Sequence, residues 1–165
     1  MLDFARRLRA GWVDIAATSE DQRVPDHELE PDFPIEFLVV GTPASLQTKR
    51  AETRDQWRAL VRQACQAVLP SGHFATERRL AATLFYFPAG RMQGDVDNII
   101  KLTLDALKRH VFMDDAQVER VLVQKFEPGV EFQFTAPTPT LARAVDHAKP
   151  VLYVRLSADP FEDFR

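Results

Sequence analysis

Acidic residues gather around one lysine between residues 94 and 115. The stretches GDVDNIIKLTLDAL (94–107) and DDAQVERVLVQKF (114–126) place five aspartates around Lys101, namely Asp95, Asp97, Asp105, Asp114 and Asp115. Two like charges 4 Å apart repel by about 4 kcal/mol at an effective dielectric of 20. A divalent cation would remove that repulsion, and carboxylates without nearby His or Cys favour Mg²⁺, with Mn²⁺ as a substitute, over Zn²⁺. The stretch therefore predicts a magnesium site.

A strand end and a helix start are expected to position the first two carboxylates. Asp95 and Asp97 would point to the same side of an extended strand end, and Asp97 is a plausible N-cap of the following helix. Asp97, Lys101 and Asp105 are spaced by four and would line one helix edge. If the strand after Asp115 lies beside the strand that ends near Asp95, the carboxylates of Asp95, Asp97 and Asp115 converge at one sheet edge.

Each of these residues also has an ordinary structural interpretation. Taken alone, Asp97 is more typical of a helix cap than of a metal ligand, and Asp105 is typical of a surface ion pair with Lys101 or Arg109. A lysine in a first helical turn is mildly unfavourable, because the N-terminal end of the helix dipole is positive. Carboxylates or a phosphate that interact with Lys101 would offset this unfavourable interaction with the helix dipole.

Hydrophobic patterns predict the elements that carry the cluster. Strands are expected in PIEFLVVG (34–41), RRLAATLFYF (78–87), QVERVLVQKFE (117–127) and KPVLYVRLS (149–157). One helix is expected over 50–69 and another after Asp97. Their apolar positions are Trp57, Leu60, Val61, Ala64, Val68 and Leu69 in the first, and Ile100, Leu104, Leu107 and Val111 in the second. Residues 128–148 contain several prolines and are expected to include a loop of variable conformation. The order predicts an α/β (α+β) fold, a mixed sheet of about four or more strands packed with two main helices.

Length and composition favour one domain behind an acidic extension. The chain has 165 residues, of which 45% are apolar, enough for one ordinary core. Residues 1–32 carry eight acids and four bases, whereas 33–165 carry seventeen bases and sixteen acids. We therefore expect an acidic N-terminal extension (1–32) and a functional domain (33–165). A single cysteine and the lack of a long apolar run lead us to expect a cytoplasmic protein that neither enters a membrane nor forms an internal disulfide.

A basic stretch is the candidate surface for a polyanion. Residues 48–62 hold five bases against two acids. The candidate phosphate contacts are Lys49, Arg50, Arg54, Arg58, Arg62 and, just before the acidic cluster, Arg91. Charge alone also fits a solvated helix face. Phe85, Tyr86 and Phe87 are a weaker candidate for an aromatic surface, since strand alternation buries at least one of them. No glycine-rich phosphate loop is present, so we expect no nucleotide cofactor. Zinc and thiol chemistry are also disfavoured, because the histidines are scattered and Cys65 lies on an apolar helix face.

The segment DVDNIIKLTLDALKRHVFMDDAQV (95–118) resembles the signature of the RusA family of Holliday-junction resolvases, D-x-D-N-x-x-K-x-x-x-D-A-L followed by D-D-x-x-V. The resemblance implies that Asp95, Asp97 and Asp115 are catalytic, Mg²⁺-binding residues and that Lys101 is an essential lysine. It implies supporting positions for Asn98 and Asp114.

The same resemblance implies a homodimer that resolves four-way DNA junctions by paired symmetric nicks in recombination and repair. Two alternatives remain. One is a non-catalytic protein that binds branched DNA on the same fold. The other is a dimeric interaction protein on which the acidic cluster is surface decoration.

Overall fold

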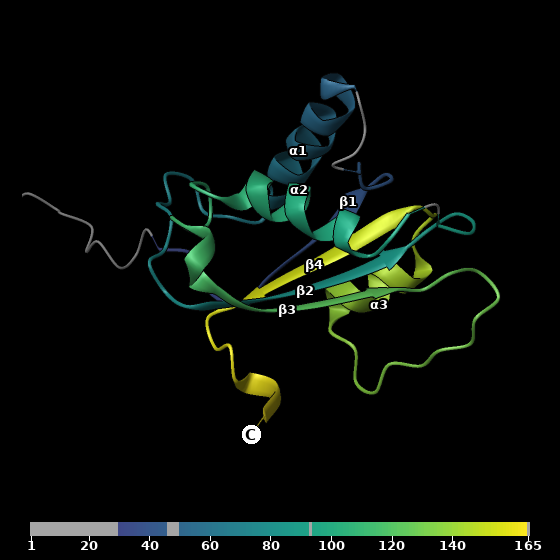
Figure 1. Ribbon diagram of the computed structural model, residues 1–165. Coiled ribbons are helices and arrows are strands. Elements are labelled where there is room, and N and C mark those ends of the chain that lie inside the picture. Colours follow the sequence, from purple (N-terminus) through teal and green to yellow (C-terminus); the bar gives the residue numbers. More distant parts are fainter. Residues whose placement is uncertain (1–29, 46–49, 93, 165) are drawn as a thin grey trace, which may run out of the picture.

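The computed structural model of the chain describes residues 30–45, 50–92 and 94–164, and its main elements surround one four-stranded sheet (Figure 1). The strands are β1 (Ile35–Val40), β2 (Leu80–Phe87), β3 (Val118–Lys125) and β4 (Val151–Ser157). The helices are α1 (Ala51–Gln66), α2 (Asp97–Leu107) and α3 (Pro139–Asp146), with 3₁₀ turns η2 (Asp115–Gln117) and η3 (Glu162–Phe164). The predicted acidic extension falls largely on residues 1–29, outside the described residues.

The sheet is mixed, as the sequence predicts. Its strand order is β1-β4-β2-β3, with β4 antiparallel to both neighbours and β2 parallel to β3. The two central strands are buried almost continuously, because both of their faces are covered, whereas the edge strands β1 and β3 alternate between more and less exposed residues. This difference explains why β2 and β4 are largely apolar in sequence on both faces.

Helices α1 and α2 cover one face of the sheet and α3 lies on the other (Figure 1). Trp57, Val61 and Cys65 form the buried stripe of α1, spaced by four residues. Burial raises the pKa of the Cys65 thiol to about 12, which agrees with the expectation that this cysteine is no nucleophile. The predicted positions Leu60 and Val68 are 42% and 49% exposed, so the contact stripe is narrower than the sequence suggests.

The buried face of α2 is shifted by one residue from the predicted one. Its fully buried residues include Ile99 and Leu102, whereas Ile100 and Leu104 only pack against the margin of the core. The predicted burial of Leu107 and Val111 is confirmed, although the helix ends at Leu107 and Val111 is buried from the turn that follows.

A third helix, α3, lies within residues 128–148, a segment for which the sequence predicts a loop and no helix. Thr138 caps it, since its hydroxyl oxygen accepts a hydrogen bond of 3.1 Å from the Leu141 amide, and Pro139 occupies the first helical position. The prolines that suggested a loop therefore include one that starts a helix. Among the described residues, no helix has the length and apolar content that crossing a bilayer requires.

A buried hydrogen bond joins the two helices that frame the candidate site. The indole Nε1 of Trp57 donates to the hydroxyl oxygen of Thr103 over 3.2 Å, and both residues are buried. We expect Thr103→Val to lower the free energy of unfolding by about 1–3 kcal/mol, because it leaves a buried N–H without an acceptor. Urea unfolding measures the change. In a Trp57→Phe background the same substitution should cost clearly less, and an equal cost in both backgrounds would contradict this coupling.

Candidate active site along helix α2

The parallel pairing of β2 with β3 decides where the aspartates lie. Leu80 pairs with Val118 and Tyr86 with Lys125, so the two strands start at the same end of the sheet. Helix α2 carries the chain back between them. Its 11 residues span about 16 Å. Asp95 and Asp97 therefore follow the end of β2, while Asp115 precedes the start of β3 at the opposite end.

The expected convergence of three carboxylates is consequently not found in the described structure. The two strands are neighbours as predicted, but the end of one does not meet the start of the other. Within residues 30–45, 50–92 and 94–164, no three His, Cys, Asp or Glu side chains lie close enough together to hold a metal ion. The sequence spacing predicted the strands and the helix correctly. It did not predict that the length of α2 would separate Asp95 and Asp97 from Asp115.

Ion pairs between lysines and aspartates lie along one edge of α2, between its two ends. The Lys101 ammonium lies 2.5 Å from an Asp105 oxygen and 3.6 Å from an Asp115 oxygen. Lys108 lies 3.5 Å from Asp115 and 3.0 Å from Asp114. The hydrogen bond that Lys101 donates to Asp105, aided by the charges of Asp105 and Asp115, raises the pKa of Lys101, so this lysine stays cationic.

Asp97 does not cap the helix, contrary to the prediction. It is the first helical residue, the N-cap position belongs to Val96, and no side chain caps that end. Asp95 and Asp97 are both exposed. An acidic side chain in the first turn is favourable beside the positive end of the helix dipole. These two carboxylates are therefore accessible to a ligand from solvent.

The supporting residue Asn98 connects α2 to the loop after β1. Its Oδ1 accepts a hydrogen bond of 2.8 Å from the Ser45 hydroxyl, and its backbone N–H donates to the Asp95 carbonyl over 3.1 Å. Gly94 precedes it with φ +109°, and a Cβ there would lie 3.1 Å from the Asn98 amide nitrogen. The positive φ favours glycine here, and a Cβ would require the Asn98 side-chain amide to shift by a few tenths of an ångström. The sequence did not reveal Ser45, because this contact depends on the tertiary fold.

The supporting residue Asp114 forms a capping box that fixes η2. One Asp114 oxygen accepts from the Ala116 amide over 3.0 Å, and Gln117 Oε1 accepts from the Asp114 amide over 2.7 Å. The Gln117 side-chain nitrogen also donates to the carbonyls of Thr76 and Arg78, over 2.8 Å and 2.9 Å. Gln117, which the sequence analysis missed, therefore anchors the Asp114–Asp115 turn to the segment that enters β2. The motif D-D-x-Q alone carries a weak capping-box signal.

The donor atoms and the accessibility of Asp95, Asp97 and Asp115 fit a hard divalent cation. All three side chains are exposed and offer only carboxylate oxygens. Asp115 is already compensated by Lys101 and Lys108. The three carboxylates are therefore chemically suitable ligands for Mg²⁺, although Asp115 already forms ion pairs with two lysines.

The predicted basic stripe lies beside this edge. Arg58 is 3.0 Å from Asp55 and 3.9 Å from an Asp105 oxygen, so α1 and α2 share one charged surface. Arg62 donates from Nε to the Ala106 carbonyl over 3.1 Å, which gives it a structural role that the sequence did not reveal. Arg54 lies one turn before Arg58 on α1.

The remaining predicted DNA contacts have different placements. Arg50 is exposed at the N-cap position of α1, and Arg91 is exposed in the loop after β2. Lys49 lies outside the described residues.

The aromatic run of β2 offers no open surface. Tyr86 and Phe87 are buried, on opposite faces of the sheet. Phe85 stacks against Phe134 and Tyr153, with ring centroids 5.6 Å and 5.8 Å apart. These rings are part of the two cores, so the proposed aromatic DNA contact is not supported at this place.

The pKa of Asp114 depends on two contacts of its carboxylate, with the Ala116 amide and with Lys108. The Ala116 amide and, after it, Lys108 hold that pKa below the ordinary value of 3.8. Because the folded pKa is the lower one, the stabilisation is present above pH 3.8 and is lost as the pH falls toward the folded pKa. We expect Lys108→Met to raise the Asp114 pKa part of the way back, since the Ala116 hydrogen bond remains. Carboxyl-carbon NMR titration in EDTA checks this, and an unchanged pKa would show that the Lys108 contact is absent in solution.

Comparison with known proteins identifies a family whose model matches this part of the chain. The family model described as "Endodeoxyribonuclease RusA" matches residues 40–133, a range that begins at the end of β1 and includes α1, α2 and both strands around α2. A search of curated proteins gave no match. The matched range includes every aspartate of the cluster and Lys101. The chain belongs to the RusA family of endodeoxyribonucleases.

Proposed function

We propose that this protein is a Mg²⁺-dependent, structure-specific endodeoxyribonuclease that acts as a homodimer and resolves four-way DNA junctions by paired symmetric nicks, in recombination and repair. The observation that carries the proposal is the charged edge of α2, which lies within the family match and combines two accessible carboxylates with a lysine held between Asp105 and Asp115.

Asp95, Asp97 and Asp115 are the residues that would hold the cation, with Mn²⁺ as a possible substitute for Mg²⁺. When bound, Mg²⁺ would lower the pKa of an attacking water and stabilise the negative charge that develops on the phosphate. Asn98 and Asp114 position the two ends of this carboxylate set, since they fix the loop before α2 and the turn before β3.

Lys101 is proposed to contact the scissile phosphate or the leaving oxygen. Its raised pKa keeps it cationic, and its side chain is 52% exposed, so a phosphate can approach it from solvent. Its two carboxylate partners hold the ammonium group near the middle of the carboxylate set. A neutral side chain of similar length would keep the packing and lose this charge.

The proposed DNA contacts are Lys49, Arg50, Arg54, Arg58, Arg62 and Arg91. Such contacts bind the phosphate backbone and position the enzyme without reading sequence. The proximity of Arg58 to Asp105 supports the assignment, because DNA lying along α1 would pass beside the charged edge of α2. Arg62 is the weakest member, since its Nε already binds the Ala106 carbonyl.

A homodimer suits the proposed substrate. A four-way junction can adopt two-fold symmetry, and two identical sites related by a dimer axis would cut two strands of like polarity. One site per complex would nick only one strand at a time.

A non-catalytic protein that binds branched DNA is the alternative. It is favoured by one observation, namely that the three carboxylates do not gather in the described residues and that two lysines hold Asp115. The same arginine-rich surface would serve such a protein. Cleavage in the presence of Mg²⁺ separates the two.

We expect Asp97→Asn to reduce cleavage of a labelled four-way junction by more than about 100-fold while junction binding is kept. The substitution removes negative charge near the phosphate and therefore should not weaken association. Denaturing gels with Mg²⁺ or EDTA measure cleavage, gel shifts measure binding, and sedimentation velocity tests the dimer.

The matched control is Asp146→Asn, which makes the same change on exposed α3 at the other face of the sheet and should leave cleavage unchanged. Wild-type protein that binds the junction and never cuts it in Mg²⁺ or Mn²⁺ would support the non-catalytic alternative. Full activity of Asp97→Asn would remove that residue from the metal site.

A further inference from the structure

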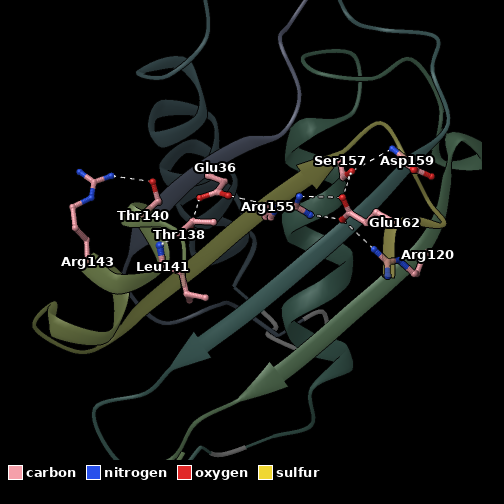
Figure 2. A network of polar contacts seen from close by, with 10 residues as sticks. All are labelled: Glu36, Arg120, Thr138, Thr140, Leu141, Arg143, Arg155, Ser157, Asp159 and Glu162. Atoms are coloured by element: carbon pink, nitrogen blue, oxygen red, sulfur yellow. Dashed lines mark hydrogen bonds and ion pairs between the residues drawn. The ribbon is translucent and has the colours of Figure 1, made fainter. Parts of the chain in front are cut away.

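The segment after β4 covers arginines on the sheet face opposite α1 and α2. Residues 159–164 turn back beneath the sheet, on the same side as α3 (Figure 1). In Figure 2, the Glu162 carboxylate lies between the guanidinium groups of Arg120 on β3 and Arg155 on β4. Two cations from β3 and β4, the strands on either side of β2, thus converge on one carboxylate.

The contacts of that carboxylate are those of an anion in a binding site. Arg155 donates from both terminal nitrogens, one of them to Glu162 Oε2 over 3.0 Å. The Ser157 hydroxyl donates to the same oxygen over 2.8 Å, and Arg120 donates to Oε1 over 3.3 Å. Two guanidinium groups and a hydroxyl are also a donor set that suits a phosphodiester, because a guanidinium fork matches its two free oxygens.

Aromatic rings of the same segment lie against arginines. The Arg79 guanidinium carbon is 5.5 Å from the centre of the Phe161 ring, and that of Arg120 is 5.8 Å from the Phe164 ring. A nucleobase also stacks on a guanidinium in this way. Residues 159–164 therefore present an acid and two flat rings to three arginines, as a single strand of DNA presents phosphates and bases.

Displacement of the segment requires a ligand that replaces the contacts of Glu162. Phe161 and Phe164 are 47% and 74% exposed, whereas Pro160 is buried, so lifting the segment away would also uncover that proline. The side chains of Glu162, Arg120 and Arg155 are only 17–24% exposed, so a ligand that displaces Glu162 must form equivalent ion pairs with the two arginines.

Arg155 would keep its position without Glu162. Its Nε is 3.5 Å from Glu36 Oε1, and Glu36 Oε2 accepts a hydrogen bond of 2.6 Å from Thr138 (Figure 2). The arginine is thus oriented from its other side by a carboxylate that α3 fixes in turn. A ligand that replaces Glu162 would meet a preorganised guanidinium group.

We propose that Arg79, Arg120, Arg155 and Ser157 form a binding site for single-stranded DNA, and that residues 159–164 occupy it in the free protein as an internal competitor. The inference rests on the membership of a DNA-cutting family and is independent of the metal site on α2. Glu119 pairs with Arg79 and Glu36 with Arg155, so removal of the Glu162 charge leaves these two arginines still compensated. The expected gain in affinity is accordingly modest.

The test measures binding of a fluorescent oligo(dT) by anisotropy in EDTA, so that cleavage does not enter. Glu162→Gln should bind about 3- to 10-fold more tightly than wild type at low salt. Its slope of log affinity against log salt should steepen by up to about 1.4, since two phosphate contacts to a single strand contribute about 0.7 each. Glu131→Gln is the matched control, an exposed glutamate in the loop before α3, and should change affinity much less.

The double substitution Arg120→Ala, Arg155→Ala decides the assignment. It should abolish the gain in the Glu162→Gln background and weaken wild-type binding by a smaller factor, because Glu162 competes with DNA for those arginines in the wild type. A gain that persists without the two arginines, or that Glu131→Gln reproduces, would overturn the proposal. So would unchanged affinity in a Glu162→Gln protein with a normal thermal transition.

A measurement on the wild-type chain covers the case in which Glu162→Gln fails to fold. Addition of oligo(dT) should shift the amide NMR signals of residues 159–164 together with those of Arg120 and Ser157. Shifts confined to α1 would overturn the proposal and leave the junction-cleaving function untouched.

Discussion

The parallel pairing of β2 with β3 is the constraint on which the rest of the arrangement depends. Because parallel neighbours need a crossover, α2 must run back along the sheet between them. That return path places Asp95 and Asp97 at one end of the helix and Asp114 and Asp115 toward the other. The lysines along the helix edge then become the groups that link the two ends.

This geometry gives Lys101 a role that its position in the helix alone did not explain. A cation near the positive end of a helix dipole is unfavourable, yet Asp105 and Asp115 offset that cost and keep the side chain charged. The same pairs keep like-charged aspartates from facing one another without compensation. On the opposite face of the sheet, Glu162 compensates Arg120 and Arg155 in a similar way. Both faces therefore present charged groups that are balanced within the protein and chemically suited to DNA or its counterions.

The sequence predicts the sheet well because its strands have simple patterns. The branched apolar runs of β1 and β4, and the order of elements around α2, were all visible without coordinates. Helix α3 was missed because Pro139 was taken as a loop signal, although a proline at the first helical position favours a helix start. The roles of Ser45, Gln117 and Lys108 could not be predicted, since each depends on contacts between segments whose separation only the packed fold decides.

We propose that Asp95, Asp97 and Asp115 act together on one metal centre although α2 separates them in the described structure. Titration of labelled protein with paramagnetic Mn²⁺ distinguishes a shared centre from separate carboxylates, because bound Mn²⁺ broadens the amide signals of nearby residues. We expect the signals of residues 94–98 and 114–117 to broaden together at low Mn²⁺, and Asp97→Asn to weaken both effects. Broadening at only one of these segments, or none until Mn²⁺ affects the whole surface, would contradict it.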